Sequence, residues 1–442
     1  MTAYLCERAW LGPGDIADNV LVEVEGTHIT AVTPSWSSLG GTRLAGLTIP
    51  GFANCHSHVF HRALRGRTQR ERGSFWTWRQ AMYDVAARLQ PDTYYALAHA
   101  TYREMALAGI TAVGEFHYLH HDSSGSPYSD PNAMGLAVIE AARDAGLRIA
   151  ILDTCYLSSG FGAVPGGVQV RFSDGSADNW AERVSNLADR FEGVTDRHVV
   201  VGSAIHSVRA VPRDSLATVA NVLPERPVHI HLSEQVAENE ACHQYYGRTP
   251  TQLLGEAGIL SDRLTAVHAT HLTAADIALL GGASVYVDFC PTTERDLADG
   301  IGPSRALADA GARLTLGSDS HAVIDMHEEM RAVELDERLA SQQRGHWQSH
   351  ELLTAATETG HRSLGFTNAG RIAPGQWADL VTIDTSTPRT AGTGQREDTV
   401  VFAATAADIT SVVASGVRLE RDHETVGRSL DSAIAALTGE MS

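Results

Sequence analysis

The sequence predicts an α/β protein that combines a TIM-like (β/α)8 barrel with a small β-sandwich module formed from both chain termini. In the middle of the chain, strand-like and helix-like segments alternate eight times without a fixed repeat length, which favours a closed parallel barrel over an open doubly wound sheet. At both ends the pattern changes to short strand-like segments alone. No Gly-x-Gly-x-x-Gly motif follows a predicted strand, which argues against a dinucleotide-binding fold.

The predicted β-module begins with residues 18–26 and 27–32, which alternate apolar and polar side chains around a Glu-Gly turn. Residues 378–384 and 411–419 have the same strand-like character near the other end of the chain. Two such sets suggest one module built from both termini, although separate hairpins that cap the barrel would also fit the pattern. The predicted division of the chain is a composite module of residues 1–47 and 372–425, a barrel of residues 48–371 and a C-terminal helix of residues 426–442.

Helical segments separate the predicted barrel strands, and two of them have clear ends. The segments Pro91–Ala108 and Pro131–Ala145 begin with proline and stop before Gly109 and Gly146, which are typical helix boundaries. The eight predicted strands are Thr48–Asn54, Thr111–Phe116, Arg148–Thr154, Val199–Ala204, Pro227–Leu232, Leu264–Ala269, Ser284–Cys290 and Arg313–Gly317.

The composition excludes several classes of partner and chemistry. A formal net charge of -19 over 442 residues argues against nucleic acid or an anionic membrane as a partner. All 34 basic residues are arginine, so Schiff-base chemistry and a carboxylated lysine that bridges two metals are excluded, and arginine is the strong cation left for an anionic substrate. Five scattered cysteines, no signal-peptide pattern and no apolar run of about 18 residues predict a cytoplasmic protein.

Polar residues gather where the predicted barrel strands end, which is the edge that carries catalytic groups in such barrels. Histidines at this many strand ends are not expected by chance. The residues are His56 and His58 after the first strand, Glu115, His117 and Tyr118 after the second, His206 after the fourth, His231 after the fifth, His268 and His271 after the sixth, and Asp319 after the eighth.

Three histidines and one aspartate at a barrel mouth suit a divalent metal ion, most often zinc. The predicted ligands are His56, His58, His231 and Asp319. His229 lies two residues before His231 and could compete with it, but a place deeper in the barrel makes it a better core histidine. The lack of lysine favours one metal, although Glu115 could in principle bridge two. A carboxylate at Glu234, three residues after His231, is placed to move protons, and His268 could stabilise a developing oxyanion.

For Glu234 the alternative interpretation is a carboxylate that caps a helix N-terminus. Residues 158–175 are rich in glycine and follow the third strand, so they could form either a lid or a long surface loop.

Several motifs resemble the amidohydrolase superfamily, deaminase branch. They are Pro-Gly-Phe-x-Asn-x-His-x-His from Pro50, the His231-Leu232-Ser233-Glu234 step, Val267-His268-Ala269-Thr270-His271 and Gly317-Ser318-Asp319-Ser320. More narrowly, four stretches look like the N-formimidoyl-L-glutamate deiminases of histidine degradation. They are Ser74–Arg79, Glu115–His121, His206–Val211 and the segment from Thr293-Glu294 to Asp299-Gly300.

This resemblance implies one zinc ion per chain on the four predicted ligands, with Glu234, His268 and Asp319 catalytic. It also implies that the glutamate part of the substrate binds to Arg79, Tyr118, His206 and Arg209, and arginine forks match carboxylates independently of the resemblance. Surface ion pairs are the alternative for both arginines. His61 stands where the family has glutamine, and an imidazole there would bind a carboxylate with a strength that depends on pH.

The predicted reaction is the hydrolysis of N-formimidoyl-L-glutamate to N-formyl-L-glutamate and ammonia. The expected partners are a small dicarboxylate substrate and a second copy of the chain in a homodimer, with no nucleic acid and no membrane. The alternatives are a deaminase for a nucleobase or another cyclic amidine on the same scaffold, and a catalytically silent member that acts as a binding or structural protein.

Overall fold

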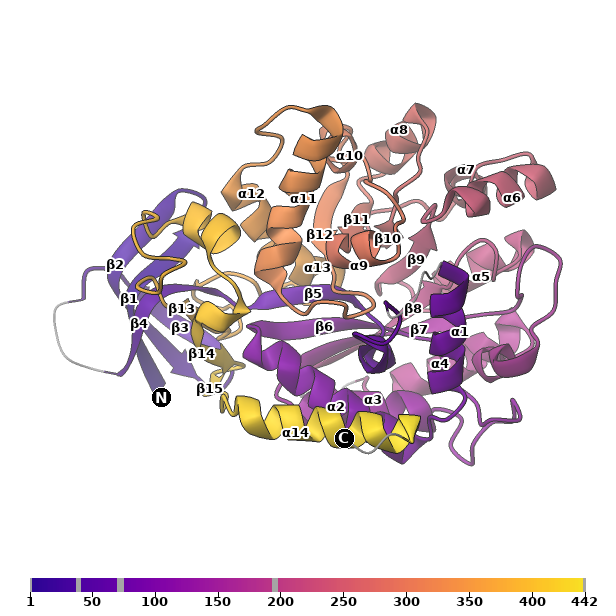
Figure 1. Cartoon of the computed structure of the whole chain (residues 1–442), viewed down its shortest axis with the longest axis horizontal. Helices are drawn as coiled ribbons and strands as arrows, with labels where there is room; N and C mark the ends of the chain where they lie inside the picture. Colours follow the sequence, from indigo (N-terminus) through magenta and orange to yellow (C-terminus); the bar gives the residue numbers. More distant parts are fainter. Residues whose placement is uncertain (1, 37–40, 70–74, 193–197, 440–442) are drawn as a thin grey trace.

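A barrel of eight parallel strands forms the larger part of the protein (Figure 1). The computed structural model describes residues 2–36, 41–69, 75–192 and 198–439. The strands follow one another around the sheet in sequence order, and a parallel bridge between Ser57 and Asp319 joins its two edges. The barrel strands are β5 (Phe52–Ser57), β6 (Ile110–His117), β7 (Arg148–Cys155), β8 (Val199–Ile205), β9 (Val228–Leu232), β10 (Leu264–His268), β11 (Tyr286–Phe289) and β12 (Arg313–Leu316).

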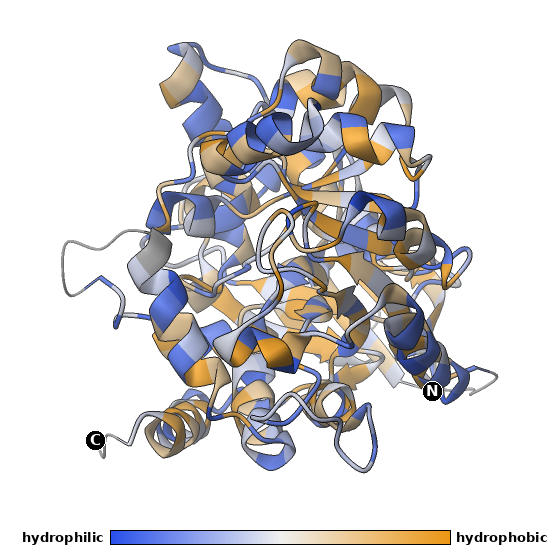
Figure 2. Ribbon diagram, turned by 90° about the vertical axis from the view of Figure 1, so that its right-hand side faces the viewer, coloured by the Kyte–Doolittle hydropathy of each residue, from blue (hydrophilic) through white to orange (hydrophobic). Residues whose placement is uncertain are grey.

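Helices surround the barrel, and Figure 2 shows hydrophobic residues gathered on the strands at its centre. The α-helices are α1 (Phe75–Ala86), α2 (Pro91–Leu107), α3 (Ala133–Asp144), α4 (Ala177–Asp189), α5 (Leu216–Asn221), α6 (Val236–Tyr246), α7 (Pro250–Glu256), α8 (Ala274–Gly282), α9 (Pro291–Asp296), α10 (Ser304–Asp309), α11 (Met326–Ser341), α12 (Ser349–Thr354), α13 (Gly360–Ser363) and α14 (His423–Thr438). Short helical turns of other types are η1 (Val59–Leu64), η2 (Gly167–Phe172), η3 (Arg213–Ser215), η4 (Ala355–Thr359), η5 (Thr399–Ala403) and η6 (Ala406–Asp408). Among the helices in the described ranges, none is both long and apolar enough to span a membrane.

The second sheet has seven strands and takes them from both ends of the chain, as predicted. In order across the sheet they are β15 (Val417–Arg418), β14 (Ile409–Ala414), β13 (Leu380–Ile383), β4 (Thr42–Pro50), β1 (Thr2–Gly12), β2 (Asp15–Glu25) and β3 (His28–Thr33). Side chains from both ends share one hydrophobic core, in which Val22 and Leu44 lie with Leu380 and Val413. The predicted fold class is therefore confirmed, and the last helix, α14, packs along α2 on the barrel (Figure 1).

The first predicted barrel strand, residues 48–54, is wrong at its start. Residues 48–50 belong to β4 in the terminal sheet, where Pro50 pairs with Leu380, and the barrel strand β5 begins only at Phe52. The break lies at Gly51, where a Cβ atom would stand 2.3 Å from the Thr111 side chain. The apolar run continues through this break, so hydrophobic periodicity alone does not reveal it.

A buried ion pair connects the barrel to the terminal sheet. Arg148, the first residue of β7, donates from both terminal nitrogens to the carboxylate of Asp379, next to β13. Neither side chain has significant exposure, and the guanidinium carbon lies 4.7 Å from the centre of the Trp377 ring. The backbone N–H of Ser415 donates to the same carboxylate at 2.8 Å. One carboxylate thus joins the barrel to two segments of the terminal sheet.

Candidate active site

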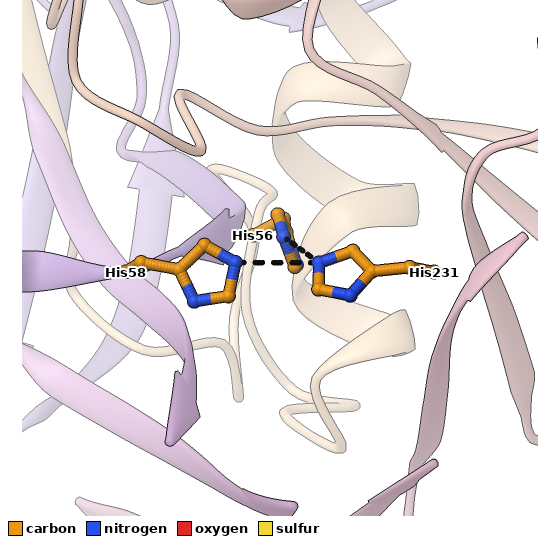
Figure 3. Close-up of side chains that lie close together, drawn as sticks. All are labelled: His56, His58 and His231. Carbon is orange, nitrogen blue, oxygen red and sulfur yellow. Dashed lines mark hydrogen bonds between the residues drawn. The ribbon is translucent and has the colours of Figure 1, made fainter. Parts of the chain in front are cut away.

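Three imidazoles meet at the mouth of the barrel (Figure 3). His56 and His58 come from the end of β5, where alternate residues of an extended strand point to the same side. His231 comes from β9, on the other side of the barrel mouth. Its Nε2 atom lies 3.1 Å from Nε2 of His56 and 3.2 Å from Nε2 of His58.

Backbone carbonyls fix the orientation of two of these rings. Nδ1 of His58 donates to the carbonyl oxygen of Phe116 at 3.0 Å, and Nδ1 of His231 donates to that of His206 at 2.9 Å. With the proton on Nδ1, both Nε2 atoms direct lone pairs toward each other. Such lone pairs repel unless a cation lies between them, and a hydrogen bond from the opposite ring nitrogen is typical of metal-binding histidines.

Asp319 supplies the fourth donor group. Its Oδ1 atom lies 3.4 Å from Nε2 of His56 and 3.4 Å from Nε2 of His58. The barrel closure positions it, because the backbone N–H of Asp319 donates to the carbonyl oxygen of His56 at 3.0 Å. A tetrahedral zinc ion with bonds of about 2.0–2.2 Å would hold its ligand atoms roughly 3.3–3.6 Å apart. The donor set therefore fits one divalent metal ion.

The other candidates for metal ligands, Glu115 and His229, belong to none of the candidate ligand groups among the described residues. Glu115 accepts from Val59 N–H with one oxygen and from the hydroxyls of Ser57 and Tyr102 with the other, and burial raises its pKa to about 8. It braces the loop after β5 and does not bridge. His229 is fully buried, and burial lowers its pKa to about 3.

In a second cluster of potential ligands, His117, His120 and Asp153, other side chains already engage the carboxylate. Arg183 donates to the two oxygens of Asp153 at 2.8 and 2.9 Å, and Trp180 adds a third donor at 2.9 Å. His117, which the strand-end rule placed at the catalytic edge without a role, does not line the cavity. It is the last residue of β6, and its ring lies next to Gly135 on α3.

Glu234 and His268 stand beside the four donors. Nε2 of His268 lies 3.9 Å from Oε1 of Glu234 and 3.8 Å from Oδ2 of Asp319. Burial raises the pKa of Glu234 above its ordinary value. Burial alone would lower the pKa of His268, but the nearby carboxylates of Glu234, Glu294 and Asp319 raise it well above the ordinary value. Glu234 precedes α6 and faces the cavity, so the capping alternative does not describe it.

Every predicted site residue except His56 lines one cavity at the barrel mouth. His56 is fully buried beneath it. Arg209 donates from Nε to the buried Glu238 at 3.2 Å, and Arg79 donates from Nε to the Tyr83 hydroxyl at 2.6 Å. The lining consists of His58, His61, Trp78, Arg79, Met82, Tyr83, Tyr118, Tyr156, Phe172, His206, Arg209, His231, Glu234, His268, Leu297 and Asp319.

The positive charges of Arg79 and Arg209 both act on His206, which lines the same cavity. Burial lowers the pKa of His206 well below its ordinary value, and the positive charges of Arg209 and Arg79 lower it further. His206 is therefore a neutral hydrogen-bonding group between two cations. This arrangement suits the binding of an anionic substrate.

His61 does not have the pH-dependent charge that the sequence analysis expected. Its Nε2 atom lies 3.0 Å from the Tyr118 hydroxyl, and burial lowers the pKa of the imidazole to about 3. The ring is therefore neutral at physiological pH, so it does not add the pH-dependent attraction that the sequence suggested. It remains a neutral hydrogen-bonding partner of Tyr118.

Six lining residues were not among the predicted site residues: Trp78, Met82, Tyr83, Tyr156, Phe172 and Leu297. Tyr83 lies one helical turn after Arg79 on α1, and that spacing could have identified it. Tyr156 directly follows β7, so the strand-end rule could also have found it. Phe172 carries no such signal, since it lies in η2 within the glycine-rich segment. Gln169 of that segment donates to the hydroxyls of Tyr156 and Tyr83, so η2 forms a wall of the cavity.

Comparisons with known proteins agree with this geometry. The model of the Amidohydrolase family matches residues 47–419. A formimidoylglutamate deiminase from Pseudomonas aeruginosa is 37% identical over 401 residues, which is 88% of this chain and 87% of the relative. A 5-methylthioadenosine/S-adenosylhomocysteine deaminase from Pelotomaculum thermopropionicum is 26% identical, with 92% and 89% covered.

Two solved structures share the fold across nearly the whole chain. An amidohydrolase from Brucella melitensis has a TM-score of 0.91 and 30% identity, and the match covers 99% of this chain and 100% of that one. An adenosine deaminase from Xanthomonas campestris with bound zinc has a TM-score of 0.86 and 22% identity, with 99% of each chain covered.

Proposed function

This chain belongs to the amidohydrolase family and hydrolyses carbon–nitrogen bonds, and we propose that its substrate is N-formimidoyl-L-glutamate. The observation that carries the proposal is the pair of arginines, Arg79 and Arg209, on the same cavity as the metal donor set. The substrate has a formimidoyl group at one end, which would react at the metal site, and two carboxylates, which would bind to the arginines. The 37% identity with a formimidoylglutamate deiminase supports the same assignment.

We propose zinc as the metal, held by His56, His58, His231 and Asp319. When bound, zinc would lower the pKa of a water molecule to about 7 and polarise the formimidoyl group. The orientation of the His58 and His231 rings by backbone carbonyls supports this role, because it keeps their Nε2 atoms available as donors.

The residues of the chain then move protons around the reacting carbon. Asp319 accepts one proton as the water oxygen attacks the formimidoyl carbon, and Glu234 transfers protons to the departing nitrogen. The carbon–nitrogen bond to that nitrogen breaks, so both water protons leave on ammonia and the water oxygen stays in the formyl group. Burial raises the pKa of Glu234, which suits a group that both accepts and returns a proton. His268 stabilises the negative charge that develops on the oxygen.

An ammonia-release assay with purified protein tests the proposal. The panel contains formimidoyl-glutamate, formimidoyl-aspartate, guanine and cytosine. We expect formimidoyl-glutamate to react with the highest kcat/KM. Faster release from a nucleobase would replace this function with the alternative of a cyclic-amidine deaminase, which the 5-methylthioadenosine/S-adenosylhomocysteine deaminase relatives represent.

Replacing Arg209 by methionine should lower kcat/KM for formimidoyl-glutamate by roughly 10- to 150-fold, mainly through a higher KM. The reason is the loss of a charged hydrogen bond worth about 1.5–3 kcal/mol to a substrate carboxylate. Because Glu238 would lose its partner, the double variant Arg209→Met/Glu238→Gln should be measured as well. Arg213→Met is the matched control, since Arg213 pairs with Glu256 on the surface. Unchanged kinetics in the Arg209 variants would contradict a dicarboxylate substrate.

Removal of the metal by a chelator should abolish ammonia release, and one equivalent of zinc should restore it. Elemental analysis is expected to give one metal ion per chain, because the carboxylate of Glu115 is fully engaged and lysine is absent. Two ions per chain would contradict the mononuclear site. Full activity without metal would contradict the proposal that the four donor residues hold a catalytic metal ion. Freshly purified protein without zinc would favour the alternative of a catalytically silent binding protein.

We further propose that the enzyme acts in histidine degradation, as a cytoplasmic homodimer. These points rest on the resemblance to the deiminases and on the composition of the chain. Size measurement in solution tests the dimer directly.

A further inference from the structure

His268 is held on the side away from the cavity by a carboxylate. Glu294 lies on α9, is only 5% exposed, and places Oε1 3.2 Å from Nδ1 of His268. The same oxygen accepts the backbone N–H of Cys290 at 2.9 Å. The carboxylate is therefore anchored at the N-terminal end of its own helix while it contacts the imidazole.

This contact determines which nitrogen of His268 faces the reaction. An anionic oxygen that already accepts one N–H favours a donor, so Nδ1 of His268 carries a proton. Nε2 then points toward Glu234 and Asp319, at 3.9 and 3.8 Å. This is the arrangement in which a buried carboxylate fixes the orientation of a catalytic histidine.

The backbone at His268 also requires support. His268 has φ +69° and Ala269 has φ +46°, and both values lie in the left-handed region that non-glycine residues rarely adopt. The backbone N–H of Ala269 donates to the carbonyl oxygen of Leu232 at 3.0 Å. That hydrogen bond restrains the backbone, and the hydrogen bond from Nδ1 of His268 to Glu294 restrains the imidazole ring.

We propose that Glu294 is a positioning residue that accepts a hydrogen bond from Nδ1 of His268 and so holds the Nε2 atom of that ring toward the substrate. This proposal rests on the function proposed above for the catalytic step, and it adds a residue that acts only through His268. Glu294 does not line the cavity. Its replacement should therefore change kcat and leave substrate binding nearly unchanged.

The kinetic test compares Glu294→Leu with Glu294→Gln. Leucine fills similar space without an acceptor, whereas glutamine retains an oxygen that can accept from Nδ1. We expect kcat of Glu294→Leu to fall by about 10- to 100-fold, with KM changed less than twofold, and Glu294→Gln to recover most of the loss. Wild-type kcat in Glu294→Leu, an equal loss in both variants, or a change confined to KM would overturn the proposal.

A matched control separates positioning from packing. Glu329 is a fully buried carboxylate on α11 that accepts from the backbone N–H of Thr292 at 3.0 Å and from its hydroxyl, so it braces the same helix α9 without reaching His268. Glu329→Gln should leave kcat within about twofold of wild type. A kcat loss in Glu329→Gln as large as that in Glu294→Leu would assign the effect to the packing of α9.

Nitrogen-15 NMR of labelled histidine gives a readout that needs no substrate. The His268 signal, identified by its loss in His268→Asn, should show a strongly hydrogen-bonded Nδ1–H in wild type and Glu294→Gln, and that hydrogen bond should be missing in Glu294→Leu. An unprotonated Nδ1 in the wild type would overturn the proposal. If instead the NMR result holds while formimidoyl-glutamate is not hydrolysed, the proposed substrate is wrong and the positioning role stands.

Discussion

Replacement of Glu234 by glutamine should lower kcat for formimidoyl-glutamate by about 10²- to 10⁴-fold while the metal content stays unchanged. This is the usual contribution of a positioned general acid or base. Glutamine has nearly the same shape as glutamate, but it cannot accept a proton from water and return it to the departing nitrogen. Because Glu234 is not one of the four predicted metal ligands, elemental analysis should still find one ion per chain.

The measurement is steady-state ammonia release at saturating substrate, together with metal analysis of the same sample. Glu240→Gln on the exposed side of α6 makes the same chemical change away from the cavity and serves as the control. Full ammonia release by Glu234→Gln would refute its role as proton carrier. A loss of the metal would instead place Glu234 among the ligands.

Replacement of Arg148 by methionine should lower the free energy of unfolding by about 3–5 kcal/mol. The reason is that the variant leaves the carboxylate of Asp379 buried without its cation, and breaking a buried pair has this cost. Chemical denaturation at pH 7.5 measures the loss. Arg190→Met removes an exposed ion pair with Asp130 and should cost less than about 1 kcal/mol.

The pH dependence identifies the origin of this loss. In the wild type, burial alone would raise the pKa of Asp379, but Arg148 holds it below the ordinary value of 3.8. The stability from the pair is therefore fully present above about pH 4 and is lost only as pH falls through the lower, folded-state pKa. Without Arg148 the buried carboxyl group should take up a proton at higher pH. The difference between variant and wild type should thus shrink from pH 8 to pH 5, and a constant difference would point to lost packing instead.

The positions of the predicted site residues follow from one rule about parallel strands. The carboxyl ends of such strands meet at one edge, so residues as distant as His58, His231 and Asp319 could be assigned to one cavity without knowledge of the contacts between them. The strand-end rule gives the edge of the barrel at which a residue lies, but it does not say whether the side chain points into the barrel or out of it. His117 follows Phe116 on β6 and therefore points out of the barrel, away from the cavity.

Residues from the loops were harder to predict because their positions depend on tertiary contacts. Phe172 reaches the cavity from η2, and Arg171 helps to hold η2 in place by donating to the backbone carbonyls of Leu89 and His121. Charge states were also beyond the sequence. The low pKa of His61 comes from complete burial. Its position three residues after a metal ligand does not predict how deeply it is buried.

The pairing of β4 with β13 has a consequence for synthesis of the protein in the cell. Thr48 and Thr382 face each other in this sheet although they are 334 residues apart in the chain. At a translation rate of about 5–20 residues per second, β4 leaves the ribosome roughly 20 to 70 seconds before its partner exists. During that interval one edge of β4 lacks its backbone partners while the whole barrel is made. An unpaired strand edge can pair with another chain, so this edge of β4 is open to aggregation until β13 has been made.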